Sequence, residues 1–185
     1  MKVIVGCEFS QIVTMAFRNK GWEAFSCDLL PTEGNPAWHY QEDIFDVLKR
    51  EQFDLGIFHP PCTHLAVSGA RWFKEKRRDG RQQEAIEFFL RLANVSIGKI
   101  CIENPVSIMS TFYKKPNQII QPYQFGHGET KATCLWLKNL PKLKPTKLVE
   151  GRVARIHNEP PSEERWKNRS RTYTGIAEAM AFQWG

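Results

Sequence analysis

The chain has 185 residues and a moderate excess of positive charge. Lys and Arg number 26 against 20 Asp and Glu, which gives a net charge of +6 and a pI near 9.1. With 42% hydrophobic and 25% charged residues and no internal repeat, the composition excludes disordered, collagen-like and solenoid chains. We expect one globular domain over residues 1–185, and the positive charge favours a polyanionic partner.

Cysteine usage and hydropathy indicate the compartment. No apolar stretch approaches the roughly 20 residues of a membrane-spanning helix, and the first residues lack the pattern of a secretion signal. The five cysteines form no C-x-x-C pair and have an odd count, which suits a reducing compartment. We therefore expect a cytoplasmic protein with no membrane segment and with thiols free for chemistry.

Strand and helix patterns alternate through the first two thirds of the chain. Strands are predicted at 2–6, 23–27, 53–58 and 99–103, and helices at 10–20, 43–50 and 82–93. This alternation predicts an α/β fold, with a mostly parallel sheet and helices on both faces. Ligands of such sheets gather at the carboxyl ends of the strands, where Asp28, Cys62 and Glu103 lie.

The last third has a different character. A strand is predicted at 132–137 and a closing helix at 174–184, whereas residues 138–171 are rich in Pro, Lys and Arg with little periodicity. We expect that segment to be extended, basic and loop-rich. The charge run at 74–79 also follows a glycine-containing loop, and a loop is expected there too.

Cys62 follows a double proline directly after a predicted strand. The prolines stiffen the backbone, so the thiol is aimed like a nucleophile, although a lone cysteine is more often a buried apolar residue. His59 and His64 flank Cys62 and allow a Cys-His hydrolase or a zinc site. Their side chains point in different directions along an extended segment, and no fourth zinc ligand has suitable spacing, so no metal is expected.

Glu103-Asn-Pro lies at the end of the next strand and brings a carboxyl group to the same edge of the sheet. Together, Pro-Pro-Cys62 and Glu103-Asn-Pro resemble the paired signatures of the cytosine carbon-5 DNA methyltransferases. The resemblance implies a Rossmann-like fold that binds S-adenosylmethionine, with Cys62 as nucleophile and Glu103 as acid. Lys131, in Glu-Thr-Lys-Ala-Thr, falls where the family has an arginine that contacts the pyrimidine.

The same resemblance implies a set of cofactor-binding residues. The turn after the first strand keeps a glycine and a phenylalanine but lacks G-x-G, and Asp28 has the type and spacing of a ribose ligand. Asp43 resembles an aspartate that meets the adenine, although it could equally cap a helix. The expected residues are Gly6, Glu8, Phe9, Asp28, Asp43, Pro60, Thr174 and Gly175.

The substrate implied by the resemblance is DNA. The family usually carries a large target-recognition region, and here only residues 138–171 stand in its place, as in compact phage proteins of this type. Basic residues expected to grip nucleic acid are Lys74, Lys76, Arg77, Arg78, Arg81 and Arg171. Two alternatives remain open: the same chemistry on RNA, a free nucleotide or a modified pyrimidine, and a catalytically silent nucleic-acid-binding or regulatory protein with this fold.

Overall fold

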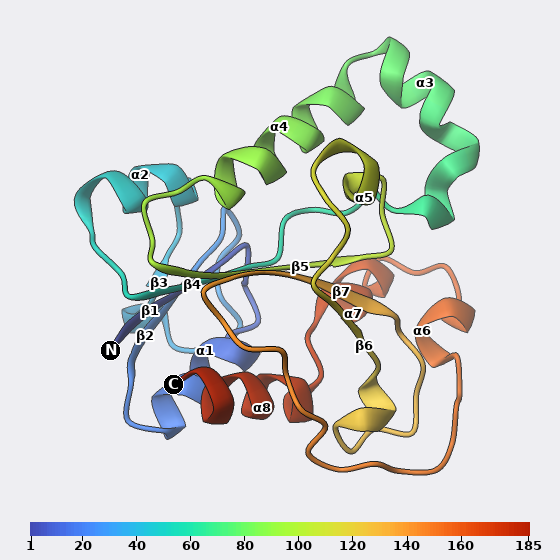
Figure 1. Ribbon diagram of the computed structural model, residues 1–185. Coiled ribbons are helices and arrows are strands. Elements are labelled where there is room, and N and C mark those ends of the chain that lie inside the picture. Colours follow the sequence, from blue (N-terminus) through green and yellow to red (C-terminus); the bar gives the residue numbers. More distant parts are fainter.

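The computed structural model describes residues 1–185 as one mixed sheet of seven strands between two layers of helices (Figure 1). The order across the sheet is β3-β2-β1-β4-β5-β7-β6. Strand β7 pairs antiparallel with both β5 and β6, and all other neighbouring strands pair parallel. The expected α/β fold with a mostly parallel sheet is therefore confirmed. The strands are β1 (Lys2–Gly6), β2 (Glu23–Cys27), β3 (His39–Tyr40), β4 (Leu55–Phe58), β5 (Lys99–Pro105), β6 (Gln118–Ile120) and β7 (Thr133–Lys138).

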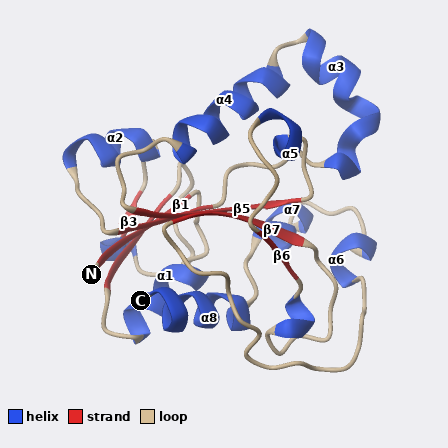
Figure 2. Ribbon diagram, viewed as in Figure 1, coloured by secondary structure: helices blue, strands red, loops and turns tan.

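Helices cover both faces of the sheet (Figure 2). Helices α1 (Ile12–Asn19) and α8 (Thr174–Trp184) pack on one face, and α2 (Ile44–Arg50), α4 (Arg81–Ala93) and α5 (Met109–Phe112) lie over the other. Because both faces are covered, the central strands are apolar throughout: Val3 and Val5 face α1, whereas Ile4 faces α2. No helix is long and apolar enough to cross a bilayer.

Two segments differ from the sequence-based expectation. The charge run expected as a loop forms α3 (Phe73–Arg78), which projects beyond the sheet. Its Lys76 is buried and bonds to the Thr63 carbonyl, which anchors this charged helix to the turn after β4. The segment 138–171, expected to be extended, contains α6 (Arg155–Asn158) and α7 (Arg165–Ser170). Single apolar residues, Leu143 and Ile156, fix this segment to the core, so it carries no periodic pattern that sequence analysis could detect.

The register of the central strands brings their carboxyl ends to one edge. Gly6 pairs with Phe58, and Phe58 pairs with Ile102, so the residues that follow β1 and β4 emerge beside Glu103 near the end of β5. Gly6 is required there because a Cβ atom at that position would overlap the Phe58 ring. Helices α6 and α7 lie beyond this same edge (Figure 1).

Candidate active site

Cys62 lies on a tight turn after β4. Its carbonyl accepts hydrogen bonds from the amides of Leu65 (3.0 Å) and Ala66 (2.9 Å). Two side chains from the neighbouring helices hold the turn: Lys76 Nζ donates to the Thr63 carbonyl at 2.6 Å, and Gln82 Nε2 donates to the His64 carbonyl at 3.1 Å. The thiol is partly exposed on a segment whose backbone is fixed from several directions.

Glu103 forms a buried pair with His59. His59 Nδ1 lies 2.8 Å from Glu103 Oε2, and the two side chains are 10% and 11% exposed. Burial raises the pKa of Glu103, but the hydrogen bond and charge of His59 outweigh burial and hold that pKa below its ordinary value. The next residue, Asn104, donates from Nδ2 to the Pro60 carbonyl at 2.9 Å, which ties the end of β5 to the Cys62 turn.

Lys131, just before β7, contributes a cation to the same edge. Its ammonium donates to the carbonyls of Arg169 (2.8 Å) and Arg171 (3.2 Å). Burial raises the pKa of the Cys62 thiol and the Glu103 charge raises it further, whereas the charge of Lys131 lowers it. The three residues expected to be catalytic therefore lie within electrostatic range of one another, and burial disfavours the thiolate form of Cys62.

Two of the expected cofactor residues cap helices. The Glu8 carboxylate is buried and accepts from the amides of Val13 (2.6 Å) and Thr14 (3.2 Å) and from the Thr14 hydroxyl (2.7 Å) at the start of α1. Asp43 caps α2 by accepting from the amide of Phe45 at 2.7 Å, which is the alternative that its sequence position allowed. Asp28 follows β2 directly, is partly exposed, and accepts from the Leu30 amide at 3.0 Å.

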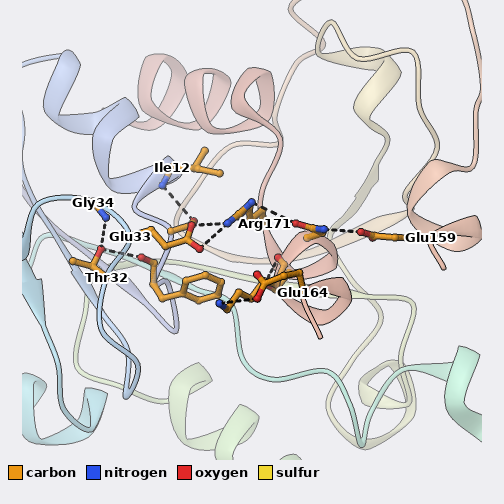
Figure 3. Close-up of polar contacts among 12 residues, drawn as sticks. Ile12, Thr32, Glu33, Gly34, Glu159, Glu164 and Arg171 are labelled. Atoms are coloured by element: carbon orange, nitrogen blue, oxygen red, sulfur yellow. Dashed lines mark hydrogen bonds and ion pairs between the residues drawn. The ribbon is translucent and has the colours of Figure 1, made fainter. Parts of the chain in front are cut away.

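Residues 159–171, here termed the C-terminal strap, cross the turn after β1. The Trp166 ring lies against the ring of Phe9, with centroids 5.7 Å apart. Arg171 makes two hydrogen bonds to the Glu33 carboxylate, at 2.6 and 2.7 Å, and Figure 3 shows this ion pair between the strap and the loop after β2. Phe9 is therefore covered by the strap in this structure.

A cavity of about 410 Å³ opens beside the strap, between the first residues of α1 and α8. Thr174 and Arg171 contribute to its wall, and across it the Tyr173 hydroxyl donates to Glu129 Oε2 at 2.7 Å. Gly175 has a packing role, because a Cβ there would overlap the Phe125 carbonyl. The volume is within the range of small-molecule sites.

The basic residues expected to bind nucleic acid divide into two groups. Lys74, Arg77 and Arg78 are exposed on α3. The other three are already engaged within the protein: Lys76 is buried against Thr63, Arg81 is paired with Asp79 and Glu75, and Arg171 is paired with Glu33. Only the first group presents cations that are both exposed and free of internal ion pairs.

Sequence reasoning weighed His59 only as a hydrolase or zinc residue and missed its contact with Glu103. A signal was present in the alternation of side chains along a strand. His59 alternates with Leu55 and Ile57, and Glu103 with Cys101, all of which face α1, so His59 and Glu103 are expected on that side too. Trp166 was also missed. It lies in a segment without periodicity, and nothing in the sequence indicates its contact with Phe9.

Comparison with known proteins identifies the fold. No protein-family model and no curated protein sequence matches the chain. Among solved structures, one match is a proposed DNA modification methyltransferase encoded within a prophage (E. coli), with 15% identity, a TM-score of 0.54, and coverage of 88% of this chain and 56% of that one. Another is the Entamoeba histolytica methyltransferase EhMeth, with 13% identity, a TM-score of 0.52, and coverage of 89% and 61%.

The chain thus spans somewhat more than half the length of the structures it matches. Its seven-stranded sheet with order 3-2-1-4-5-7-6 follows the same plan. The protein therefore has the Rossmann-like fold of the DNA methyltransferases.

Proposed function

We propose that the protein is an S-adenosylmethionine-dependent methyltransferase that acts on carbon 5 of cytosine in DNA through a covalent bond to Cys62. The observation that carries this proposal is the strand register that brings the Cys62 turn after β4, Glu103 on β5 and Lys131 before β7 to one edge of the sheet. These residues come from three separate segments: Cys62 is a nucleophile, Glu103 is an acid, and Lys131 is a cation where the family has an arginine.

The reaction assigns one task to each side chain. The Cys62 thiol first gives its proton to solvent. The thiolate then adds to carbon 6 of the pyrimidine, and Glu103 donates a proton to ring nitrogen 3, which receives the negative charge of the attack. Lys131 offers a cation to the pyrimidine carbonyl. After methylation a base removes the proton at carbon 5, the bond between sulfur and carbon 6 breaks, and nitrogen 3 returns its proton.

S-adenosylmethionine, when bound, supplies an electrophilic methyl group to carbon 5. Two separate features support a cofactor of this kind. Asp28 stands at the carboxyl end of β2, and a cavity of about 410 Å³, whose wall includes Thr174 but not Asp28, lies by the first turns of α1 and α8. Asp28 would hold the ribose hydroxyls, and Thr174 would line the pocket. Glu8 would act indirectly, by fixing α1.

DNA is the substrate that the exposed charges favour. The exposed cations Lys74, Arg77 and Arg78 lie on α3, the helix whose Lys76 bonds to Thr63 beside Cys62. A free nucleotide has too few phosphates to need three cations. A cytosine in duplex DNA must leave the stack to reach a thiol, which costs a few kcal/mol that contacts along the strand offset.

Covalent trapping tests this function. An oligonucleotide with 5-fluorocytosine has no removable proton at carbon 5, so with S-adenosylmethionine it should remain attached to the wild-type protein under denaturing conditions. Cys62→Ala should form no adduct, whereas Cys134→Ala, which changes a buried cysteine of β7, should form it normally. An adduct with a fluorinated nucleotide alone would move the substrate to the free nucleotide, and no adduct with either would leave a catalytically silent protein.

A further inference from the structure

We propose that His59 is a positioning residue of this site: it fixes the Glu103 carboxyl and stores the proton that Glu103 gives to ring nitrogen 3. The catalytic part of this inference rests on the proposed function. The His59–Glu103 pair itself is a feature of the fold.

The pair is built by strand register. Phe58 and Ile102 are partners in the ladder between β4 and β5, so the next residues, His59 and Glu103, lie side by side on the α1 face. The His59 amide donates to the Gly6 carbonyl at 3.0 Å, which extends the pairing of β4 with β1 by one residue. Pro60 follows immediately and restricts the backbone. The imidazole is therefore held rigidly, and Glu103 receives a hydrogen bond from a fixed direction.

The other nitrogen of His59 has no structural use. Nε2 is buried and has no hydrogen-bond partner in the protein, an arrangement that destabilises a fold. An apolar residue would fill this position next to β1 without that penalty. A histidine here indicates that the contact between Nδ1 and Glu103 has a purpose beyond packing.

The charges around His59 favour a proton on the pair. Glu103 lies in hydrogen-bond contact, Glu8 approaches from the turn after β1, and Lys131 approaches from the side of β7. Burial lowers the pKa of His59, but the hydrogen bond and charge of Glu103, helped by Glu8, outweigh burial and Lys131 and raise it above the ordinary value. These contacts therefore favour the form of the pair that holds one proton more than a neutral imidazole beside a carboxylate.

This stored proton balances the reaction. When sulfur bonds to carbon 6, the proton passes from the pair through Glu103 to nitrogen 3, which leaves neutral His59 beside a carboxylate. When Cys62 is eliminated, the proton returns to the pair. While the proton resides on Glu103, the carboxylate no longer raises the pKa of the Cys62 thiol, so the same shift favours the thiolate.

Titration by NMR tests the pair independently of catalysis. In protein labelled with ¹⁵N-histidine, His59 should titrate above the ordinary histidine pKa, and in Glu103→Gln it should titrate below that value, because burial is then opposed only by the more distant Glu8. His64, on the same turn but without a contact to Glu103, serves as the internal control and should shift little. A His59 pKa that does not fall in Glu103→Gln would overturn the pairing.

Single-turnover methylation tests the catalytic role. His59→Asn keeps a hydrogen-bond donor near the position of Nδ1 but cannot take up a proton, and His59→Leu can neither donate a hydrogen bond nor take up a proton. We expect both variants to lose at least tenfold in rate, to bind S-adenosylmethionine within twofold of wild type, and to shift the alkaline limb of the pH profile by at least one unit. His64→Asn should leave the rate and profile unchanged.

The outcomes separate the two proposals. If His59→Asn keeps the wild-type rate and pH profile, His59 only orients Glu103 and stores no proton, which overturns the inference. If the wild-type protein transfers no methyl group to any pyrimidine, the proposed function fails and the proton-donor role fails with it. In that case the NMR titration still decides whether His59 and Glu103 share a proton.

Discussion

Replacing Glu8 by Gln tests whether this residue serves the fold or the cofactor. Its buried carboxylate accepts three hydrogen bonds at the first turn of α1, from two amides and one hydroxyl. A glutamine keeps one acceptor oxygen but presents an NH₂ group to the remaining donors, and it removes a negative charge from the positive end of the helix dipole.

The expected loss follows from these contacts. Hydrogen bonds to a charged acceptor contribute about 1.5–3 kcal/mol each, and the amide retains part of the set, so we expect Glu8→Gln to lose about 2–4 kcal/mol of unfolding free energy. For a domain of this size the melting temperature should fall by about 4–16 °C. Glu33→Gln, which removes an exposed carboxylate paired with Arg171, should cost less than about 1 kcal/mol.

Urea denaturation followed by circular dichroism, together with calorimetric titration of S-adenosylmethionine, measures both effects. We expect Glu8→Gln to lose much of its stability and to keep most of its affinity for the cofactor at temperatures where the variant is folded. A variant as stable as wild type that no longer binds the cofactor would show that Glu8 is a ligand, and the capping argument would be wrong.

Three further predictions concern Trp166, Lys76 and the surface of α3. Trp166→Ala should tighten S-adenosylmethionine binding by about twofold to tenfold in calorimetry, because an aromatic pair worth roughly 0.5–1.5 kcal/mol no longer covers Phe9; weaker binding would instead make Trp166 a cofactor ligand. Lys76→Met should lower the unfolding free energy by about 1–3 kcal/mol and leave the salt dependence of DNA binding unchanged, because its ammonium is buried against Thr63; a reduced salt slope would refute this. Alanine substitutions at the exposed cations of α3 should lower that slope by about one for each phosphate that the helix no longer neutralises, with no change in stability. The substituted residues are Lys74, Arg77 and Arg78. An unchanged slope would remove α3 from the DNA interface.

The sheet and its main helices could be predicted because their signals are local. Burial on both faces makes each central strand a short apolar run, and every expected element forms within two residues of its predicted bounds. The positions of Cys62 and Glu103 at strand ends followed from the same pattern, because parallel strands that are neighbours end at one edge.

The remaining features depend on contacts between distant segments. Lys76 sits in a run of charges that is typical of a solvated loop, and only the approach of α3 to the Cys62 turn buries it. Asp43 fits a cofactor ligand and a helix cap equally well by sequence, and its hydrogen bond to the amide of Phe45 shows the cap. The strap contact between Trp166 and Phe9 leaves no periodic trace, so no local rule could find it.

Nucleoside analysis of methylated DNA would show whether the protein methylates carbon 5 of cytosine and whether Cys62 is needed. Unmethylated genomic DNA, which offers many sequence contexts, would be incubated with the protein and S-adenosylmethionine carrying a labelled methyl group, then digested to nucleosides and analysed by mass spectrometry. Wild-type protein and Cys134→Ala should yield labelled 5-methyldeoxycytidine, and Cys62→Ala should yield none; this result is expected if Cys62 is the nucleophile. Label on the exocyclic nitrogen of cytosine or adenine, or label at carbon 5 that persists in Cys62→Ala, would contradict it.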